Sequence, residues 1–226
     1  MLLTPLGPIA LSFDKKVHFV AKWKWALLAA VIVAIPYLIW DEVFTVYEFW
    51  GFNPDYLVDV YIGNLPIEEI SFFLVVPFAC TFIYACLEYY AKNANLKTFN
   101  LIFYVLFFAY MIWVGEVGVQ GWYTRIAISL GLLLTLYLFI KREKFRFIPL
   151  TFLFAMLPFL LVNGVLTGSF LESPIVWYNE VEFSGMRLFT IPLEDVVYGF
   201  GLIVLNILLF RFFLSLGLRA KSRSSS

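Results

Sequence analysis

Residues 70–87, with the sequence ISFFLVVPFACTFIYACL, form an uninterrupted apolar run without a charged side chain. A helix needs about 20 apolar residues, and at least about 17, to cross the hydrocarbon core of a bilayer. Further apolar runs lie at residues 2–13, 25–40, 99–117, 126–140, 147–166 and 192–214. The first of these is short and contains two prolines and a glycine, so we expect either a partial span or one clipped at its start. Because the runs are continuously apolar and do not alternate, they predict helices and not the strands of a membrane barrel.

The composition of the whole chain agrees with a membrane protein built of helices. Of its 226 residues, 62% are hydrophobic and 14% are charged, and the mean hydropathy is +0.88. A soluble domain is about half apolar and about a quarter charged. The 16 basic and 16 acidic residues cancel, which argues against nucleic acid as a partner. We therefore predict an all-α integral membrane protein, a bundle of about seven transmembrane helices of which the first is short.

The basic residues predict how the bundle is oriented. If seven runs cross the membrane, all of the 16 basic residues except Arg125 and Arg187 fall on one side. Cytoplasmic loops carry an excess of lysine and arginine. The sequence thus predicts a multi-pass protein of the cell (cytoplasmic) membrane whose C-terminus lies in the cytoplasm.

Two pairs of segments indicate an internal repeat. Residues 35–41 (IPYLIWD) are similar to 157–163 (LPFLLVN), and residues 64–69 (NLPIEE) are similar to 190–195 (TIPLED). Four spans separate the equivalent helices, so the two copies would have the same orientation, as in a parallel repeat. We expect one membrane domain composed of a first three-helix repeat at residues 1–97, a linker helix at 98–122, and a second three-helix repeat with a cytoplasmic tail at 123–226.

The acidic pairs in residues 64–69 and 190–195 lie where we expect a helix to begin. Asn64 and Thr190 are good N-cap residues, and the proline that follows suits a first helical turn. Acids there also complement the helix dipole, which is their ordinary role. Asp41, Asn163 and Glu116 lie at the same membrane level, however, and acids inside a membrane usually serve a function. The predicted site has the catalytic residues Glu68, Glu69, Glu194 and Asp195, the supporting polar residues Asp41, Asn163 and Glu116, and no metal.

Carboxyl groups in apolar surroundings suit one kind of chemistry. A carboxyl group removed from water resists ionisation, so it can stay protonated near neutral pH and act as a general acid. A neighbouring carboxylate can then take a proton back. Such a pair can protonate an alkene and deprotonate the resulting carbocation. Phe72, Phe73 and Tyr198 follow the acidic pairs closely enough to share a helix face with them, although lipid packing explains most aromatic residues here.

The two segments with a proline and an acidic pair, and the sequence around them, resemble the membrane-integral, flavin-independent lycopene cyclases. That family occurs as two small complementary subunits in some bacteria and as a domain fused to phytoene synthase in fungi, and both subunit-like halves are present in this chain. The resemblance rests on residues 65–69 (LPIEE) and 191–195 (IPLED), and on residues 11–16 (LSFDKK), 40–41 (WD), 50–53 (WGFN) and 69–73 (EISFF).

The resemblance implies a carotenoid cyclase of the intramolecular lyase or isomerase type that needs no cofactor. A carboxylic acid protonates C2 of a linear ψ end of lycopene, the neighbouring alkene captures the cation at C1, and loss of a ring proton gives a β ring, so that lycopene becomes γ-carotene and then β-carotene. Glu68 and Glu194 are the leading acids in this interpretation, with Glu69 and Asp195 as their partners. The expected partners are a lipophilic carotenoid taken from the bilayer and membrane lipid. Assembly as a homo-oligomer or with other carotenoid enzymes stays open, as does the ring type.

Other functions fit less well. A covalent retinal protein needs a lysine inside its last span, and the last lysine, Lys221, lies in the tail. Aspartate-rich motifs for prenyl diphosphates are missing. The pair Gly199 and Gly201 lies within apolar sequence and not after a strand, unlike a dinucleotide-binding fingerprint. The alternative that remains is a proton-coupled membrane transporter or a non-catalytic carotenoid-binding protein, because both also carry acids inside the membrane.

Overall fold

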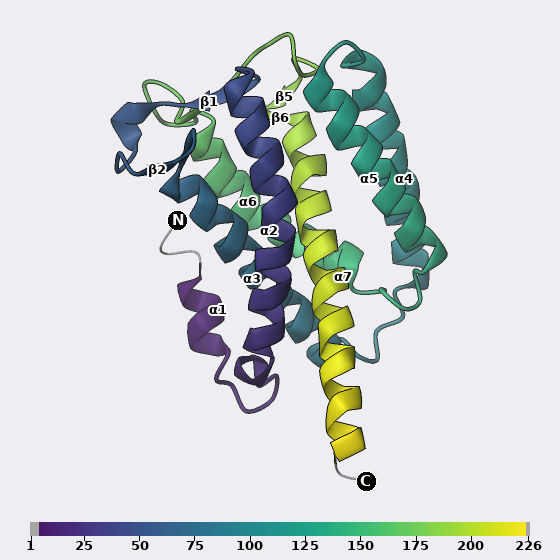
Figure 1. Cartoon of the computed structure of the whole chain (residues 1–226). Helices are drawn as coiled ribbons and strands as arrows, with labels where there is room; N and C mark the ends of the chain where they lie inside the picture. The colour runs from purple at the N-terminus through teal and green to yellow at the C-terminus, as the bar shows by residue number, and fades with distance from the viewer. Residues whose placement is uncertain (1–4, 225–226) are drawn as a thin grey trace.

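The computed structural model describes residues 5–224, with side chains up to Arg219, so residues 1–4 of the first apolar run and the side chains of Lys221 and Arg223 lie outside the described part. Helices dominate this part (Figure 1). They are α1 (Leu6–Leu11), α2 (Trp23–Val46), α3 (Ile67–Tyr90), α4 (Lys97–Val117), α5 (Trp122–Ile140), α6 (Ile148–Leu166) and α7 (Leu193–Ser224).

Six of these helices are long and apolar enough to cross a membrane, which confirms the predicted all-α membrane bundle. The exception is α1, which has six residues and is about 9 Å long at 1.5 Å per residue. Within the described residues, the first apolar run therefore contributes a short helix beside the bundle that ends at Leu11, too short to be a full span.

Small residues bring the central helices close together. On α2 the buried residues Ala26, Ala30, Val33, Tyr37 and Asp41 recur every three or four positions, so they form one face. This face packs against α3 and α7, and α7 lies at the centre of the view in Figure 1. Short side chains let backbones approach closely in membrane proteins. The same face carries Asp41 into the interior near the end of α2, where it is 2% exposed.

Short strands shape the loops that connect the helices at the end where α3 and α7 begin. One hairpin pairs β2 (Tyr61–Ile62) with β3 (Leu65–Pro66) and leads into α3. A second pairs β5 (Arg187–Leu188) with β6 (Ile191–Pro192) and leads into α7. Strands β1 (Trp50–Phe52) and β4 (Val176–Tyr178) then pair with each other, with Trp50 opposite Tyr178. The two loops are thereby held together over the bundle end, which we name the acidic end.

The predicted N-caps were wrong. Asn64 lies in the turn between β2 and β3, where its side chain donates to Glu42 Oε1 at 2.7 Å. Thr190 lies in the turn between β5 and β6, and its hydroxyl bonds to that of Ser169 at 2.7 Å. The prolines complete the hairpins, and each helix begins one residue later. A tight hairpin satisfies these polar groups without a side-chain cap.

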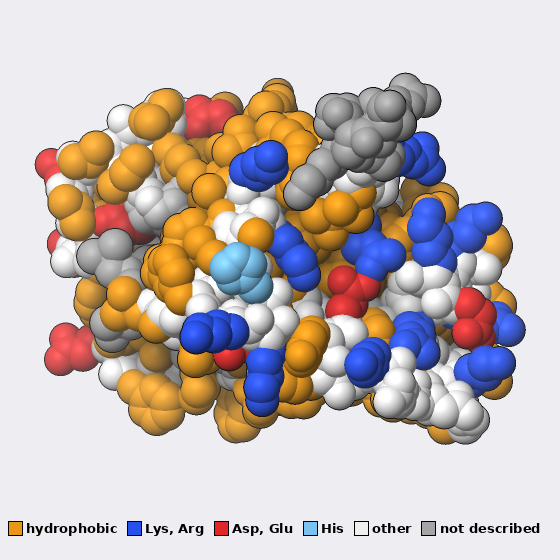
Figure 2. Space-filling view, turned by 90° about the horizontal axis from the view of Figure 1, so that it is seen from below, with side chains coloured by type: hydrophobic (Ala, Val, Ile, Leu, Met, Phe, Trp, Pro, Cys, Tyr) orange, Lys and Arg blue, Asp and Glu red, His pale blue; other side chains and the backbone are white. Residues whose placement is uncertain are grey.

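Basic side chains gather at the opposite end of the bundle, which we name the basic end; Figure 2 shows this face with lysine and arginine side chains spread across it. Where α3 and α7 reach this end, Arg211 forms an ion pair with Glu88, and the Tyr84 hydroxyl donates to Glu88 at 3.2 Å. Charge therefore divides between the two ends as the sequence pattern indicates.

The start of α5 is packed so tightly that a single methyl group should disturb it. A Cβ atom at Gly121 would lie 2.3 Å from the backbone oxygen of Glu182, which cannot turn away as a side chain can. We expect Gly121→Ala to lower the free energy of unfolding by about 1–3 kcal/mol, as overpacking does elsewhere. Thermal unfolding of the detergent-solubilised protein measures this. Gly7→Ala is the control, because no described residue lies within 4 Å of the added Cβ. Equal melting temperatures for the two variants would refute the prediction.

Candidate active site

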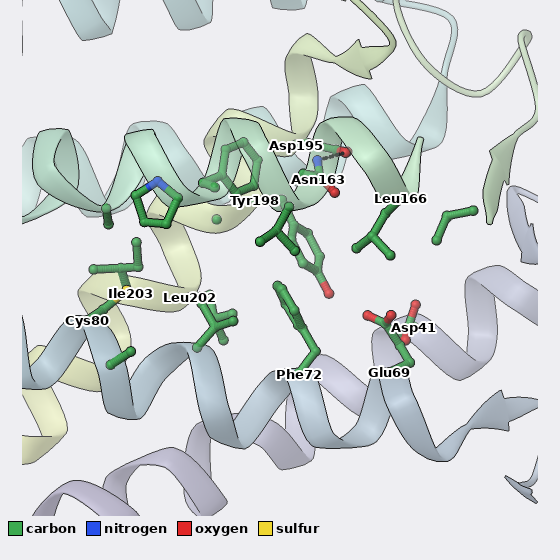
Figure 3. A pocket seen from close by; sticks show the side chains of 18 of the residues that line it. Asp41, Glu69, Phe72, Cys80, Asn163, Leu166, Asp195, Tyr198, Leu202 and Ile203 are labelled. Atoms are coloured by element: carbon green, nitrogen blue, oxygen red, sulfur yellow. Dashed lines mark hydrogen bonds between the residues drawn. The ribbon is translucent and has the colours of Figure 1, made fainter. Parts of the chain in front are cut away.

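An elongated apolar pocket lies between α3, α6 and α7, and the loops that carry β1 and β4 cover its end (Figure 3). It encloses about 1130 Å³, counting its open side. From α3 the lining runs from Glu69 through Phe72, Val76 and Cys80 to Ile83. These residues share one helix face and extend over 14 positions, or about 21 Å at 1.5 Å per residue. The pocket can thus hold a long, narrow, apolar molecule.

All the carboxyl groups that line the pocket lie where the pocket reaches the acidic end of the bundle. Asp41 comes from α2, Glu69 from α3 and Asp195 from α7, and Asn163 joins them from α6. Figure 3 shows the Asp41 and Glu69 side chains next to each other, with Asp195 and Asn163 across the pocket. Four of the seven residues predicted from the sequence therefore meet in one place.

The other three predicted residues lie elsewhere. Glu68 accepts a hydrogen bond from the backbone N–H of Val58 at 2.8 Å. Glu194 is fully buried on another side of α7, where Oε1 accepts from Thr124 Oγ1 at 2.6 Å and from the Ser184 N–H at 2.7 Å. Glu116 is exposed near the end of α4 and does not line the pocket.

The structure separates the two members of each acidic pair. Glu68 and Glu194 were expected to be the leading acids, whereas Glu69 and Asp195 face the pocket. Successive residues on a helix point about 100° apart, and of each acidic pair one member lines the pocket and the other does not. Both helices begin at the same place relative to their hairpin, which explains why the second acid of each pair is the one that faces inward.

Three donors converge on Asp195. Tyr123 donates its hydroxyl to Oδ1 at 2.6 Å, and Asn163 Nδ2 and the Tyr178 hydroxyl donate to Oδ2 at 2.8 and 2.9 Å. Hydrogen bonds to a carboxylate stabilise its ionised form. Burial, together with the neighbouring Asp195 charge, raises the pKa of Tyr178 well above its usual range, so that its hydroxyl stays protonated and donates at every physiological pH. Within the described residues, Asp195 accepts more hydrogen bonds than the other two carboxyl groups of the pocket.

Asp41 and Glu69 have far fewer donors. Trp50 Nε1 donates to Asp41 Oδ1 at 2.6 Å, and the buried Oδ2 has no partner among the described residues. Within residues 5–219 no group donates a hydrogen bond to Glu69, whose charged neighbours are Asp41 and Asp195. Two negative charges next to each other in apolar surroundings repel each other strongly.

Aromatic rings surround the carboxyl groups. The Tyr198 ring centroid lies 4.9 Å from that of Trp40 and 6.3 Å from that of Trp50, and Trp50 lies 5.1 Å from Tyr123. Tyr123 and Tyr178 carry no sequence signal that would reveal their contact with Asp195, because they come from distant segments. Within the described residues, no group of three or more His, Cys, Asp or Glu side chains is placed to hold a metal ion.

Comparison with known proteins identifies the family. A family model described as "Lycopene cyclase" matches residues 1–87 and 120–213. These segments include Asp41, Glu69, Asn163 and Asp195, and the unmatched residues 88–119 include all of α4. No curated protein and no solved structure matches the chain. Six apolar helices and a match over most of the chain make this a multi-pass membrane protein of carotenoid biosynthesis with carotenoid cyclase activity, and the chain belongs to the lycopene cyclase family.

Proposed function

We propose that the protein cyclises the linear ψ ends of lycopene to β rings without any redox change, giving γ-carotene and then β-carotene. One observation carries the proposal: three carboxyl groups, of Asp41, Glu69 and Asp195, stand at one end of a long apolar pocket. A linear polyene fits along the pocket, and its terminus would then lie among the carboxyl groups. In reaction class the enzyme is an intramolecular lyase or isomerase.

Glu69 is the proposed general acid. No described residue donates a hydrogen bond that would stabilise its anion, and it stands beside Asp41 and Asp195. A further negative charge at this point is unfavourable, so Glu69 carries the proton. In the first step the O–H bond of Glu69 breaks as a C–H bond forms at C2 of the ψ end. The cation left at C1 is attacked by the C5=C6 π electrons, which close the C1–C6 bond and move the cation to C5.

Asp195 is the proposed base. Three hydrogen bonds keep it ionised, so it can accept the proton lost from C6 as the C5=C6 double bond forms again. One proton is added and one is removed, so the reaction leaves the oxidation state unchanged. The proton returns from Asp195 to Glu69 before the next turnover. Asp41 is next to Glu69, with one of its oxygens unpartnered, and serves this return as a positioning residue.

Aromatic ring faces stabilise the C1 and C5 carbocations of the proposed reaction. A ring face stabilises a nearby cation by about 0.5–2 kcal/mol. Phe72, Trp50 and Tyr198 line the pocket close to the carboxyl groups. The C1 and C5 cations would therefore form among rings and not in contact with water, which favours ring closure over capture by a water molecule.

We also propose how the bundle is oriented in the membrane. The basic end faces the cytoplasm, following the excess of lysine and arginine there, so the C-terminus is cytoplasmic and the membrane is the cell membrane. The matching hairpins before α3 and α7 support two parallel repeats, 1–97 and 123–226, joined by the linker at 98–122. The carotenoid enters from the bilayer.

Expression in a lycopene-accumulating bacterial host, followed by chromatography of the extracted pigments, tests the function. We expect γ-carotene and β-carotene in cells with the protein and lycopene alone in cells with an empty vector. Unchanged lycopene in cells whose membranes contain the folded protein would refute the proposal and favour a transporter or a non-catalytic carotenoid-binding protein.

A further inference from the structure

A second, smaller hollow lies at the basic end, far along the bundle from the carboxyl groups. It measures about 290 Å³, its open side included, and lies between the start of α4 and the loop from α5 to α6. Its polar lining includes Lys97, Asn100, Arg142, Glu143 and Arg146. Three cations and one carboxylate leave it with an excess of positive charge at a membrane surface. Basic hollows between transmembrane helices commonly bind phospholipid headgroups.

The hollow is fixed in shape by buried contacts. Asn100 is 2% exposed, and its Nδ2 donates to the backbone oxygen of Arg146 at 3.0 Å. The Arg146 guanidinium donates to the backbone oxygens of Lys92 and Ala94, which ties the loop after α3 to the loop after α5. Arg146 is therefore a structural residue whose donors are largely used.

Two polar groups in the hollow remain available. The guanidinium of Arg142 lies over the Phe139 ring, 4.9 Å from its centroid, and makes one long hydrogen bond, of 3.4 Å, to the Phe139 oxygen. Among the described residues no other acceptor binds it, which leaves most of its five N–H groups for an anion. Asn100 Oδ1 is buried and has no partner among the described residues. A buried acceptor without a partner is costly, so a ligand that supplies a donor is favoured.

We propose that this hollow binds a phospholipid whose headgroup combines a phosphate with a free hydroxyl, of the phosphatidylglycerol type. The phosphate accepts from Arg142 and Lys97, since a guanidinium fork suits phosphate oxygens. The headgroup hydroxyl donates to Asn100 Oδ1 or to the Glu143 carboxylate. Phosphatidylcholine offers the phosphate but neither the hydroxyl donor nor the net negative charge, so the hollow discriminates against it.

The test uses the full-length protein in a neutral detergent, titrated with phosphatidylglycerol, phosphatidylcholine or inorganic phosphate while thermal unfolding is followed. We expect phosphatidylglycerol to raise the melting temperature more than phosphatidylcholine does. Arg142→Gln should weaken the apparent affinity for phosphatidylglycerol about tenfold or more, because it removes a charge-assisted contact. Lipid retained in native mass spectra gives a second readout on the same samples.

Lys144→Gln is the matched control. It removes the same charge from the same loop, but Lys144 is exposed and does not line the hollow. The control should keep the wild-type response to phosphatidylglycerol. Equal responses of Arg142→Gln and Lys144→Gln would overturn the site. Equal effects of phosphatidylcholine and phosphatidylglycerol would overturn the headgroup, and an equal effect of inorganic phosphate would show a free anion in place of a lipid.

Discussion

Glu69→Gln is expected to abolish cyclisation. The amide has nearly the same shape as the acid but cannot protonate an alkene, and losing a general acid costs about 10²–10⁴ in rate. In the lycopene-accumulating host, cells with this variant should keep lycopene and contain at most traces of cyclic products. The measurement is the ratio of cyclic to linear pigment, normalised to the amount of membrane-inserted protein.

Glu68→Gln is the matched control for this variant. Glu68 is the adjacent glutamate in the sequence, but it accepts a hydrogen bond from the Val58 N–H and does not line the pocket. The glutamine keeps an oxygen for that hydrogen bond, so activity should stay close to that of the wild type. Loss of activity in Glu68→Gln with activity kept in Glu69→Gln would reverse the assignment of the acid.

Asp195→Asn is expected to have the second large effect, and a different one. The single oxygen of the asparagine can still accept hydrogen bonds from Asn163 and Tyr178, whereas its amide nitrogen replaces the oxygen that accepts from Tyr123, and the amide is a poor base. Because the acid remains, the cation still forms, and its proton is then lost slowly or from another carbon. We expect the total cyclised product to fall about 10²-fold or more, with a larger share of rings other than β. Chromatography that separates the ring isomers measures both quantities.

Glu194→Gln accompanies Asp195→Asn as its control. Glu194 lies outside the pocket, and a glutamine oxygen can still accept from Thr124 and from the Ser184 N–H. The ring ratio of this variant should equal that of the wild type, even if its yield falls with folding. A changed ring ratio in Glu194→Gln and an unchanged one in Asp195→Asn would contradict the proposed base.

The helices themselves could be predicted from the sequence with little error. Six apolar runs became six long helices, because only a helix satisfies its own backbone in a bilayer. The two Pro-x-acid segments also indicated where the carboxyl groups would gather, since acids near the membrane interior are costly without a cavity to face. Asp41 and Asn163, recognised by their position at helix ends, do join the pocket.

Which acids face the pocket was decided by the tertiary structure. In a soluble helix a polar face shows which side is buried. The membrane helices here are apolar all round, since lipid and protein interior are equally apolar, so their rotation about their own axes leaves no trace in the sequence. The hairpins before α3 and α7 and the packing of α2, α3 and α7 fix that rotation, turning Glu69 and Asp195 inward and Glu68 and Glu194 away.

The donors to Asp195 also depend on the tertiary structure alone. Tyr123 and Tyr178 are two of 13 tyrosines in the chain, and they reach Asp195 from positions 72 and 17 residues away. The pairing of β1 with β4 and the packing of α5 against α7 bring them there. The sequence by itself determined that carboxyl groups meet at one end of a helical membrane bundle. Only the folded chain decided which of them face the pocket and how many hydrogen-bond donors surround each one.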